Sequence, residues 1–361
     1  MKRTDISVAA AMEQGSNNFD LIRLIAALTV LISHSFSLIS SPHEPFIRYL
    51  GNYDSGGGLA VSIFFFISGF LIYRSSERHN MATYMKSRAL RIMPGLLVCL
   101  IFTTFIVGPI FTNLSLGNYF TNSETHNHLL GFFVFNITTT LPGVFSNLPI
   151  PAVNGSLWTL PIEATFYLLF PVFLSLGLIN GRTLLLCAIL AIGSYVVLPA
   201  YLPPEFGVLR SIQFFPALRM FCFFTMGACY WEFRDRIKLS AGTVACFAIL
   251  LYLGIYSPAK FIIYVLSVGY LVMYFGLAFP IKFALGQRVG DISYGTYLYA
   301  FPVQQAVITV FGASIGALGV SAIAAPIAMG LGYLSWRFVE KPFLQIRHAI
   351  PSYDNDWNRV R

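Results

Sequence analysis

The residues best suited to chemistry lie in an apolar stretch near the amino terminus, FDLIRLIAALTVLISHSF, which covers positions 19–36. It contains Arg23 and His34, eleven positions apart. On an α-helix this spacing makes three turns plus about 20°, so both side chains project from one stripe, roughly 16 Å apart. An ionisable group inside a membrane span costs about 3 kcal/mol or more unless it faces protein or water. We therefore interpret both residues as candidate functional groups; the alternative is a snorkelling arginine and a structural histidine.

Glu163 is the third candidate, in an apolar run predicted at 156–178. Its depth in that span is close to that of His34, about 8–10 Å from the helix end on the same side. A carboxylate beside an imidazole orients the ring and raises its basicity, as a general base requires. We expect the two to pair; the alternative is a structural polar contact worth about 0.6–2 kcal/mol. His126 and His128 are too weak a signal to predict a metal site.

The composition indicates a polytopic membrane protein, because 56% of the 361 residues are hydrophobic and 11% are charged. The net charge of +8 does not predict nucleic-acid binding, because the basic residues gather on one side of the predicted spans. All the cysteines fall in apolar runs, so neither a disulfide framework nor a metal cluster is expected. They are Cys99, Cys187, Cys222, Cys229 and Cys246.

The sequence predicts an all-α transmembrane helix bundle of about ten spans. Residues 1–18 are polar and lack a signal-peptide cleavage pattern, so we expect the first span to be retained. The glycine triplet 56–58 is expected to be flexible or re-entrant. The apolar runs lie at 19–39, 59–73, 92–111, 156–178, 183–200, 211–231, 239–257, 261–280, 290–312 and 316–338.

Lys and Arg predict the orientation of the bundle. With ten spans both termini lie on one side, and eighteen of the 23 basic residues fall on that side. Three fall on the other, namely Arg48, Arg210 and Lys260, and the remaining two, Arg23 and Arg219, lie within spans. By the positive-inside rule both termini are cytoplasmic. The loop 112–155 has no Lys or Arg and is expected outside, with its apolar part 129–140 in the interface or dipping into the bundle.

Six stretches in order resemble the acyltransferase-3 family, bacterial membrane acyltransferases that O-acetylate surface polysaccharides. The most specific is the arginine, ten residues, histidine spacing of Arg23 and His34. The resemblance runs from about 20 to 342, which implies a cytoplasmic segment 1–18, a membrane acyltransferase domain 19–342 and a cytoplasmic tail 343–361. The other five stretches are FFFISGFLI (64–72), RALRIMPG (88–95), GSLWTLPIEATFYLLFP (155–171), SYGTYLYAFP (293–302) and SWRFVEKPF (335–343).

The sequence departs from the family pattern at two places. Many relatives have a histidine where this chain has Ala300, so His34 is the only base expected. Some relatives also carry a soluble esterase-like domain after the last span, whereas only about twenty residues follow here. The resemblance implies transfer of an acetyl group from cytoplasmic acetyl-CoA to a glycan or lipid-linked saccharide, in the bacterial inner membrane and without a metal.

The resemblance also assigns roles to the remaining candidates. His34, oriented by Glu163, would act as general base or acyl relay. Arg88 and Arg91 would bind the phosphates of acetyl-CoA through forked hydrogen bonds, with Arg23 along the path. Charge alone predicts only a topology signal and lipid contact for this pair. Ser68, Trp158 and Tyr297 are candidates for binding substrate, and their alternatives are helix packing and an interfacial belt.

Two other functions remain open. A proton-coupled secondary transporter would use His34 and Glu163 as a proton relay, although the two halves of the chain show no matching broken segments. A flippase or binding protein for lipid-linked sugar would use the aromatic loop 112–155.

The predicted topology can be tested by cysteine labelling in intact cells. A cysteine at Ser123 should react with an impermeant reagent added outside, and a cysteine in the segment 74–91 should not. The unchanged chain, with its five native cysteines, is the control. If the cysteine in the segment 74–91 were labelled from outside, the assigned orientation and the depths of His34 and Glu163 in their spans would be wrong.

Overall fold

The computed structural model describes residues 5–346 apart from 51–52, 204–205, 210–211, 255, 284 and 286–288. The described residues include only part of the predicted segment 1–18 and of the predicted tail 343–361. Arg210 lies outside the described residues. The first half of the described chain forms β1 (Ile6–Ser7), α1 (Val8–Glu13), α2 (Phe19–Leu38), α3 (Pro45–Tyr49), α4 (Gly56–Arg78), α5 (Met81–Phe102), a π-helical segment (Thr103–Val107), α6 (Gly108–Phe111), α7 (Leu116–Thr121), α8 (Ser123–Leu129), 3₁₀ segments (Leu130–Phe133 and Gly155–Thr159) and α9 (Leu160–Ser175).

Helices also dominate the second half. It forms α10 (Gly181–Val197), a 3₁₀ turn (Leu198–Ala200), β2 (Gly207–Leu209), β3 (Ile212–Gln213), α11 (Phe214–Glu232), β4 (Lys238–Leu239), α12 (Ala241–Gly254), α13 (Lys260–Met273), a π-helical segment (Tyr274–Ala278), α15 (Ser293–Phe311), a 3₁₀ turn (Ala313–Ile315), α16 (Gly316–Ser335), a π-helical segment (Trp336–Glu340) and α17 (Lys341–Ile346). The short strands pair antiparallel, β1 with β4 and β2 with β3.

Each predicted apolar run corresponds to a helical unit, so the mostly helical fold is confirmed. In the described part of the chain, seven units are long and apolar enough to cross a membrane. Of the other three runs, α11 contains Arg219, α15 contains Gln304 and Gln305, and α12 has 14 residues. The seven candidates are Phe19–Leu38, Gly56–Arg78, Met81–Phe111, Gly155–Ser175, Gly181–Ala200, Lys260–Ala278 and Ala313–Ile346.

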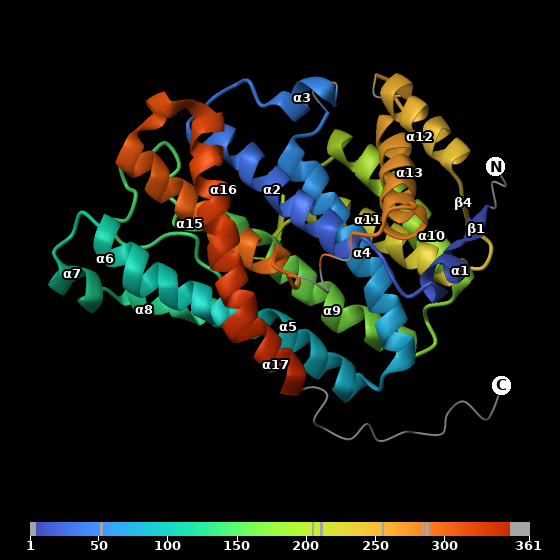
Figure 1. Ribbon diagram of the computed structural model, residues 1–361, viewed down its shortest axis with the longest axis horizontal. Coiled ribbons are helices and arrows are strands. Elements are labelled where there is room, and N and C mark those ends of the chain that lie inside the picture. Colours follow the sequence, from blue (N-terminus) through green and yellow to red (C-terminus); the bar gives the residue numbers. More distant parts are fainter. Residues whose placement is uncertain are drawn as a thin grey trace.

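The centre of the bundle is the pairing of α4 with α11, two helices far apart in the sequence (Figure 1). Gly69 of α4 and Gly227 of α11 let the two backbones approach closely, because a Cβ at either position would collide with a backbone carbonyl of the partner helix. Small residues permit this kind of approach between helices in a membrane. On the other side of α4 lies α2, which also packs against α15 and α16.

The glycine triplet at 56–58 is helical, which differs from the flexible or re-entrant segment that we predicted. It forms the first turn of α4, and the Ser55 side chain caps the turn by accepting from the Gly58 amide at 3.0 Å. A Cβ at Gly56 would lie within 3 Å of the Phe46 ring, and one at Gly58 would collide with the Asp54 carboxylate. The triplet is therefore needed for close packing.

The long 112–155 connection packs against the bundle at the end opposite α12 and α13 (Figure 1). Val134, in the apolar part that we expected to dip inward, is buried in a cluster with Leu96 and Leu100 of α5. His128 is also buried, and its ring nitrogens lie 3.1 Å from the hydroxyls of Thr103 and Thr138. Burial lowers the pKa of His128 to about 4, so the ring is neutral at pH 7.

The α4–α11 contact gives a stability prediction. Gly69→Ala and Gly227→Ala should each reduce the free energy of unfolding by about 1–3 kcal/mol, because the added methyl forces the helices apart. The loss should be measurable as a lower midpoint of thermal unfolding in detergent. Gly193→Ala in α10 is the matched control, since nothing lies within 4 Å of its Cβ position. An unchanged midpoint in both test variants would contradict the close packing.

Candidate active site

A narrow cavity of about 110 Å³ brings together six of the eight predicted site residues, and we refer to it as the arginine cavity. Its walls come from α2, α4, α5, α9 and α15, helices distributed over most of the chain. Three guanidinium groups and one carboxylate line it, together with tyrosine and serine hydroxyls. The six residues are Arg23, Ser68, Arg88, Arg91, Glu163 and Tyr297.

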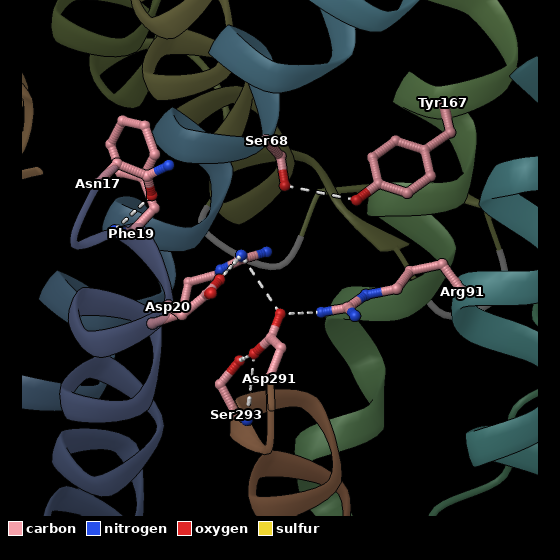
Figure 2. A network of polar contacts seen from close by, with 9 residues as sticks. Asn17, Phe19, Asp20, Ser68, Arg91, Tyr167, Asp291 and Ser293 are labelled. Atoms are coloured by element: carbon pink, nitrogen blue, oxygen red, sulfur yellow. Dashed lines mark hydrogen bonds and ion pairs between the residues drawn. The ribbon is translucent and has the colours of Figure 1, made fainter. Parts of the chain in front are cut away.

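Asp291, just before α15, neutralises two of the three arginines. Its carboxylate accepts a hydrogen bond from Arg91 and lies 3.3 Å from Arg23 in a second ion pair (Figure 2). The Ser293 hydroxyl also donates to it, at 2.5 Å. The attraction to two guanidiniums offsets the cost of keeping this carboxylate out of water. Asp291 therefore joins α2, α5 and α15.

Sequence reasoning missed Asp291. The signal that could have found it is an acidic residue directly before the SYGTYLYAFP stretch, in a chain where buried arginines need counter-ions. Arg23 has a second partner, Asp20, one turn earlier on its own helix.

Arg88 lacks a carboxylate partner among the described residues. Its Nη2 lies 3.4 Å from the Ser75 hydroxyl, and its guanidinium lies over the rings of Tyr84 and Tyr167 at 5.7 and 5.8 Å. Its Nε is buried without a hydrogen-bond partner. Arg88 thus keeps both its charge and a free donor toward the cavity, as a binding site for an anion requires.

Glu163 points into the arginine cavity and accepts a hydrogen bond from Tyr167, one turn further along α9. The Tyr167 hydroxyl lies 3.4 Å from that of Ser68 (Figure 2). The hydrogen bond that we expected between Glu163 and His34 is not formed among the described residues. The expected depth of Glu163 assumed a continuous α-helix, whereas residues 155–159 are 3₁₀, which turns about 20° more per residue and rises further. Glu163 lines the arginine cavity, and His34 does not.

His34 and Trp158 lie in a second, wider cavity of about 730 Å³, which we refer to as the histidine pocket. The His34 ring packs edge-on against Phe301, with the ring centres 5.5 Å apart. Its Nδ1 is buried without a hydrogen-bond partner. The imidazole is therefore held by packing, and a ring nitrogen is left without a partner beside the pocket.

Tyr297 and Val61 line both cavities and so form the wall between them. The Tyr297 hydroxyl donates to the Ser156 carbonyl at 2.6 Å and lies 2.8 Å from the Thr159 hydroxyl. Both partners belong to the 3₁₀ segment at the start of the fourth predicted span. This segment thus fixes a ring at the contact of the two cavities.

A further ion pair that sequence reasoning missed lies in the histidine pocket. Arg219 of α11 donates to both carboxylate oxygens of Asp54, and the Tyr264 hydroxyl donates to the same carboxylate at 2.6 Å. Arg219 was recognised only as a basic residue within a span, because its partner lies in a connection whose position the sequence does not reveal.

The fold and the two cavities define a helical membrane protein with an arginine-lined cavity next to a histidine pocket. Residues 16–337 match the acyltransferase-3 family, described as an acyltransferase domain, and the chain belongs to this family. It is 34% identical over 354 residues to an O-acetyl transferase of Shigella phage Sf6, covering 91% of this chain and 96% of the relative.

A second similar protein is nodulation protein 10 of Rhizobium leguminosarum bv. viciae. It is 26% identical over 375 residues, covering 92% of this chain and 95% of the relative. No solved structure gives a significant match. The family resemblance seen in the motifs is thus confirmed over nearly the whole described chain.

The role of Asp291 gives a prediction with a matched control. Asp291→Asn leaves the Arg91 guanidinium without an ion-pair partner and Arg23 with Asp20 alone. It should lose about 3–5 kcal/mol of unfolding free energy, measured by thermal unfolding in detergent. Asp20→Asn removes a partly exposed partner of Arg23 alone and should cost about 1 kcal/mol or less. Equal losses in the two variants would contradict a central role for Asp291.

Proposed function

We propose that this protein is an O-acetyltransferase of the bacterial inner membrane that moves an acetyl group from cytoplasmic acetyl-CoA to a hydroxyl of an extracytoplasmic glycan. The observation that carries the proposal is the pair of cavities that meet at Tyr297, one with a free guanidinium and one with a buried imidazole. Family membership and the O-acetyl transferase relative support the acyl-transfer chemistry.

The proposed arrangement has ten crossings with both termini in the cytoplasm. The count of basic residues supports this orientation, because eighteen lie on the terminus side. The arginine cavity then opens toward the cytoplasm, because Arg88 and Arg91, which line it, belong to the basic segment 74–91. The histidine pocket opens outward.

The arginine cavity suits the donor. Arg88 offers a charge-assisted hydrogen bond to a phosphate oxygen, whereas Arg91 and Arg23 are already paired with Asp291 and supply positive potential to the cavity. A cavity volume of about 110 Å³ suits a thin chain such as the pantetheine arm better than a sugar. The acyl group would reach His34 past the wall formed by Tyr297 and Val61.

His34 is the proposed general base. Its free ring nitrogen would take the proton of a sugar hydroxyl while the oxygen attacks the thioester carbonyl; the carbon–sulfur bond breaks and the thiolate then takes up a proton. An acyl relay through His34 is the alternative route. Because Glu163 bonds to Tyr167 and lies in the arginine cavity, we propose that it orients Tyr167 and Ser68 near the acyl group.

The proton-coupled transporter is less well supported, because its relay needs His34 and Glu163 to exchange a proton directly. The two side chains line different cavities, on either side of Tyr297.

Two variants separate donor binding from chemistry. Arg88→Ala should weaken acetyl-CoA binding and raise its Michaelis constant, a loss of about 1.5–3 kcal/mol of charged hydrogen bonding, and Arg88→Lys should recover only part. His34→Ala should bind acetyl-CoA normally yet lose transfer by a factor of about 10² to 10⁴. Purified protein with surface glycan as acceptor gives both readouts.

The controls are protein abundance and the midpoint of thermal unfolding. Both variants should keep these two quantities near their wild-type values. An acetyl adduct on His34, trapped without acceptor and found by mass spectrometry, would select the relay over direct attack. A wild-type rate of acetyl transfer by His34→Ala at normal protein abundance would contradict the proposed mechanism.

A further inference from the structure

The histidine pocket contains an ion pair that the proposed transfer chemistry does not use. Arg219 and Asp54 both line the pocket, with side-chain exposures of 16% and 4%. Burying an ion pair is expensive, and a pair placed inside a membrane protein marks a functional site by default. The position of this pair beside His34 points to recognition of the second substrate.

The Asp54 carboxylate has no capacity left for a ligand. One oxygen accepts from the Ser55 amide at 2.8 Å and from Arg219 at 3.0 Å. The other accepts from the Tyr264 hydroxyl at 2.6 Å and from Arg219. With about four lone-pair sites on a carboxylate, these bonds satisfy the group. Asp54 therefore neutralises Arg219 and does not act as a base or as an acceptor for a substrate.

Arg219, in contrast, keeps a donor. Its Nη atoms bond to Asp54 and to the Ser62 hydroxyl, the latter at 3.1 Å. Its Nε is buried without a partner, and such an orphaned N–H is costly unless something else accepts from it. A neutralised guanidinium with a free N–H suits an uncharged oxygen, such as a hydroxyl or ring oxygen, better than a carboxylate.

The rest of the pocket has the same character. Asp54 and Arg219 are the formal charges among its described lining residues, and they cancel. Serine hydroxyls and four aromatic side chains also line it, and an aromatic face packs well against the apolar face of a sugar ring. A cavity of about 730 Å³ is within the usual size of a small-molecule site. Besides His34, the aromatic residues are Trp158, Tyr195, Phe215 and Tyr297.

We propose that the histidine pocket binds an uncharged sugar unit of the acceptor, and that Arg219, neutralised by Asp54, is the donor that recognises it and excludes acidic sugars. This inference rests on the proposed function, because it identifies the acceptor of that reaction. Exclusion follows from the charge balance: a uronic acid would bring a carboxylate into the pocket with no free cation to pair with it.

The test measures binding of two matched sugars, methyl β-glucopyranoside and methyl β-glucuronide, which differ only at C6. Saturation-transfer NMR with the purified full chain should detect the glucoside and show the glucuronide binding about tenfold more weakly. Asp54→Asn leaves the Arg219 charge unpaired and should shift the ratio about tenfold toward the glucuronide. Tyr53→Phe is the matched control, because that buried hydroxyl has no partner and Tyr53 is not among the lining residues.

A second variant covers the case in which Asp54→Asn does not fold. Asp54→Asn combined with Arg219→Gln removes both charges, so it should keep the preference for the uncharged glucoside while binding it more weakly. Equal or tighter glucuronide binding by the unchanged protein, or no saturation transfer from either sugar, would overturn the inference.

Acetyl-CoA binding, measured separately on the same preparation, distinguishes this inference from the proposed function. Sugar selectivity without acetyl-CoA binding supports the pocket assignment and refutes the donor. Acetyl-CoA binding with no selectivity between the sugars refutes the pocket assignment alone.

Discussion

Asp291 lies just before α15 and forms ion pairs with both Arg23 on α2 and Arg91 on α5. Three helices that are far apart in the sequence are thereby held at one point inside the bundle. The attraction between these charges offsets the cost of keeping two guanidiniums out of water. Among the three arginines of this cavity, Arg88 is the one without a carboxylate partner in the described part of the chain. The interaction that joins the helices therefore also leaves the Arg88 charge uncompensated.

The two cavities differ in how their charges are balanced. In the arginine cavity Asp291 balances part of the positive charge and Arg88 remains free, which suits an anion. In the histidine pocket Asp54 balances Arg219 completely and four hydrogen bonds saturate the carboxylate. A single chain thus presents a cationic site and a neutral site within the thickness of one bundle, separated by Tyr297 and Val61.

The helices were predictable from the sequence because hydropathy alone marks an apolar run; the first predicted span, 19–39, agrees with α2 to within one residue. Most of the candidate site could be predicted because the motif residues do converge on one cavity.

The residues that were wrongly placed or missed have local causes. Glu163 was misplaced because a short 3₁₀ segment precedes α9, and 3₁₀ and α geometry cannot be told apart in an apolar run. Asp54 was missed because it lies in a connection between spans, which gains its position only from tertiary contacts. Asp291 was missed because it lies at the start of the run 290–312 and its partners, Arg23 and Arg91, come from other helices.

The wall at Tyr297 also bears on the electrical behaviour of the membrane. With the two cavities opening to opposite sides as proposed, water fills much of the bundle from both ends, and the low-dielectric barrier shrinks to the layer of Tyr297, Val61 and the 3₁₀ segment. The transmembrane potential then falls mainly across this layer, at about 2.3 kcal/mol per charge per 100 mV. A proton released near His34 would cross little of that field on its way outward, whereas one entering the arginine cavity would cross nearly all of it. In the proposed reaction, the tyrosine between the two cavities would therefore also act as the insulator that lets an acyl group pass without a leak of protons.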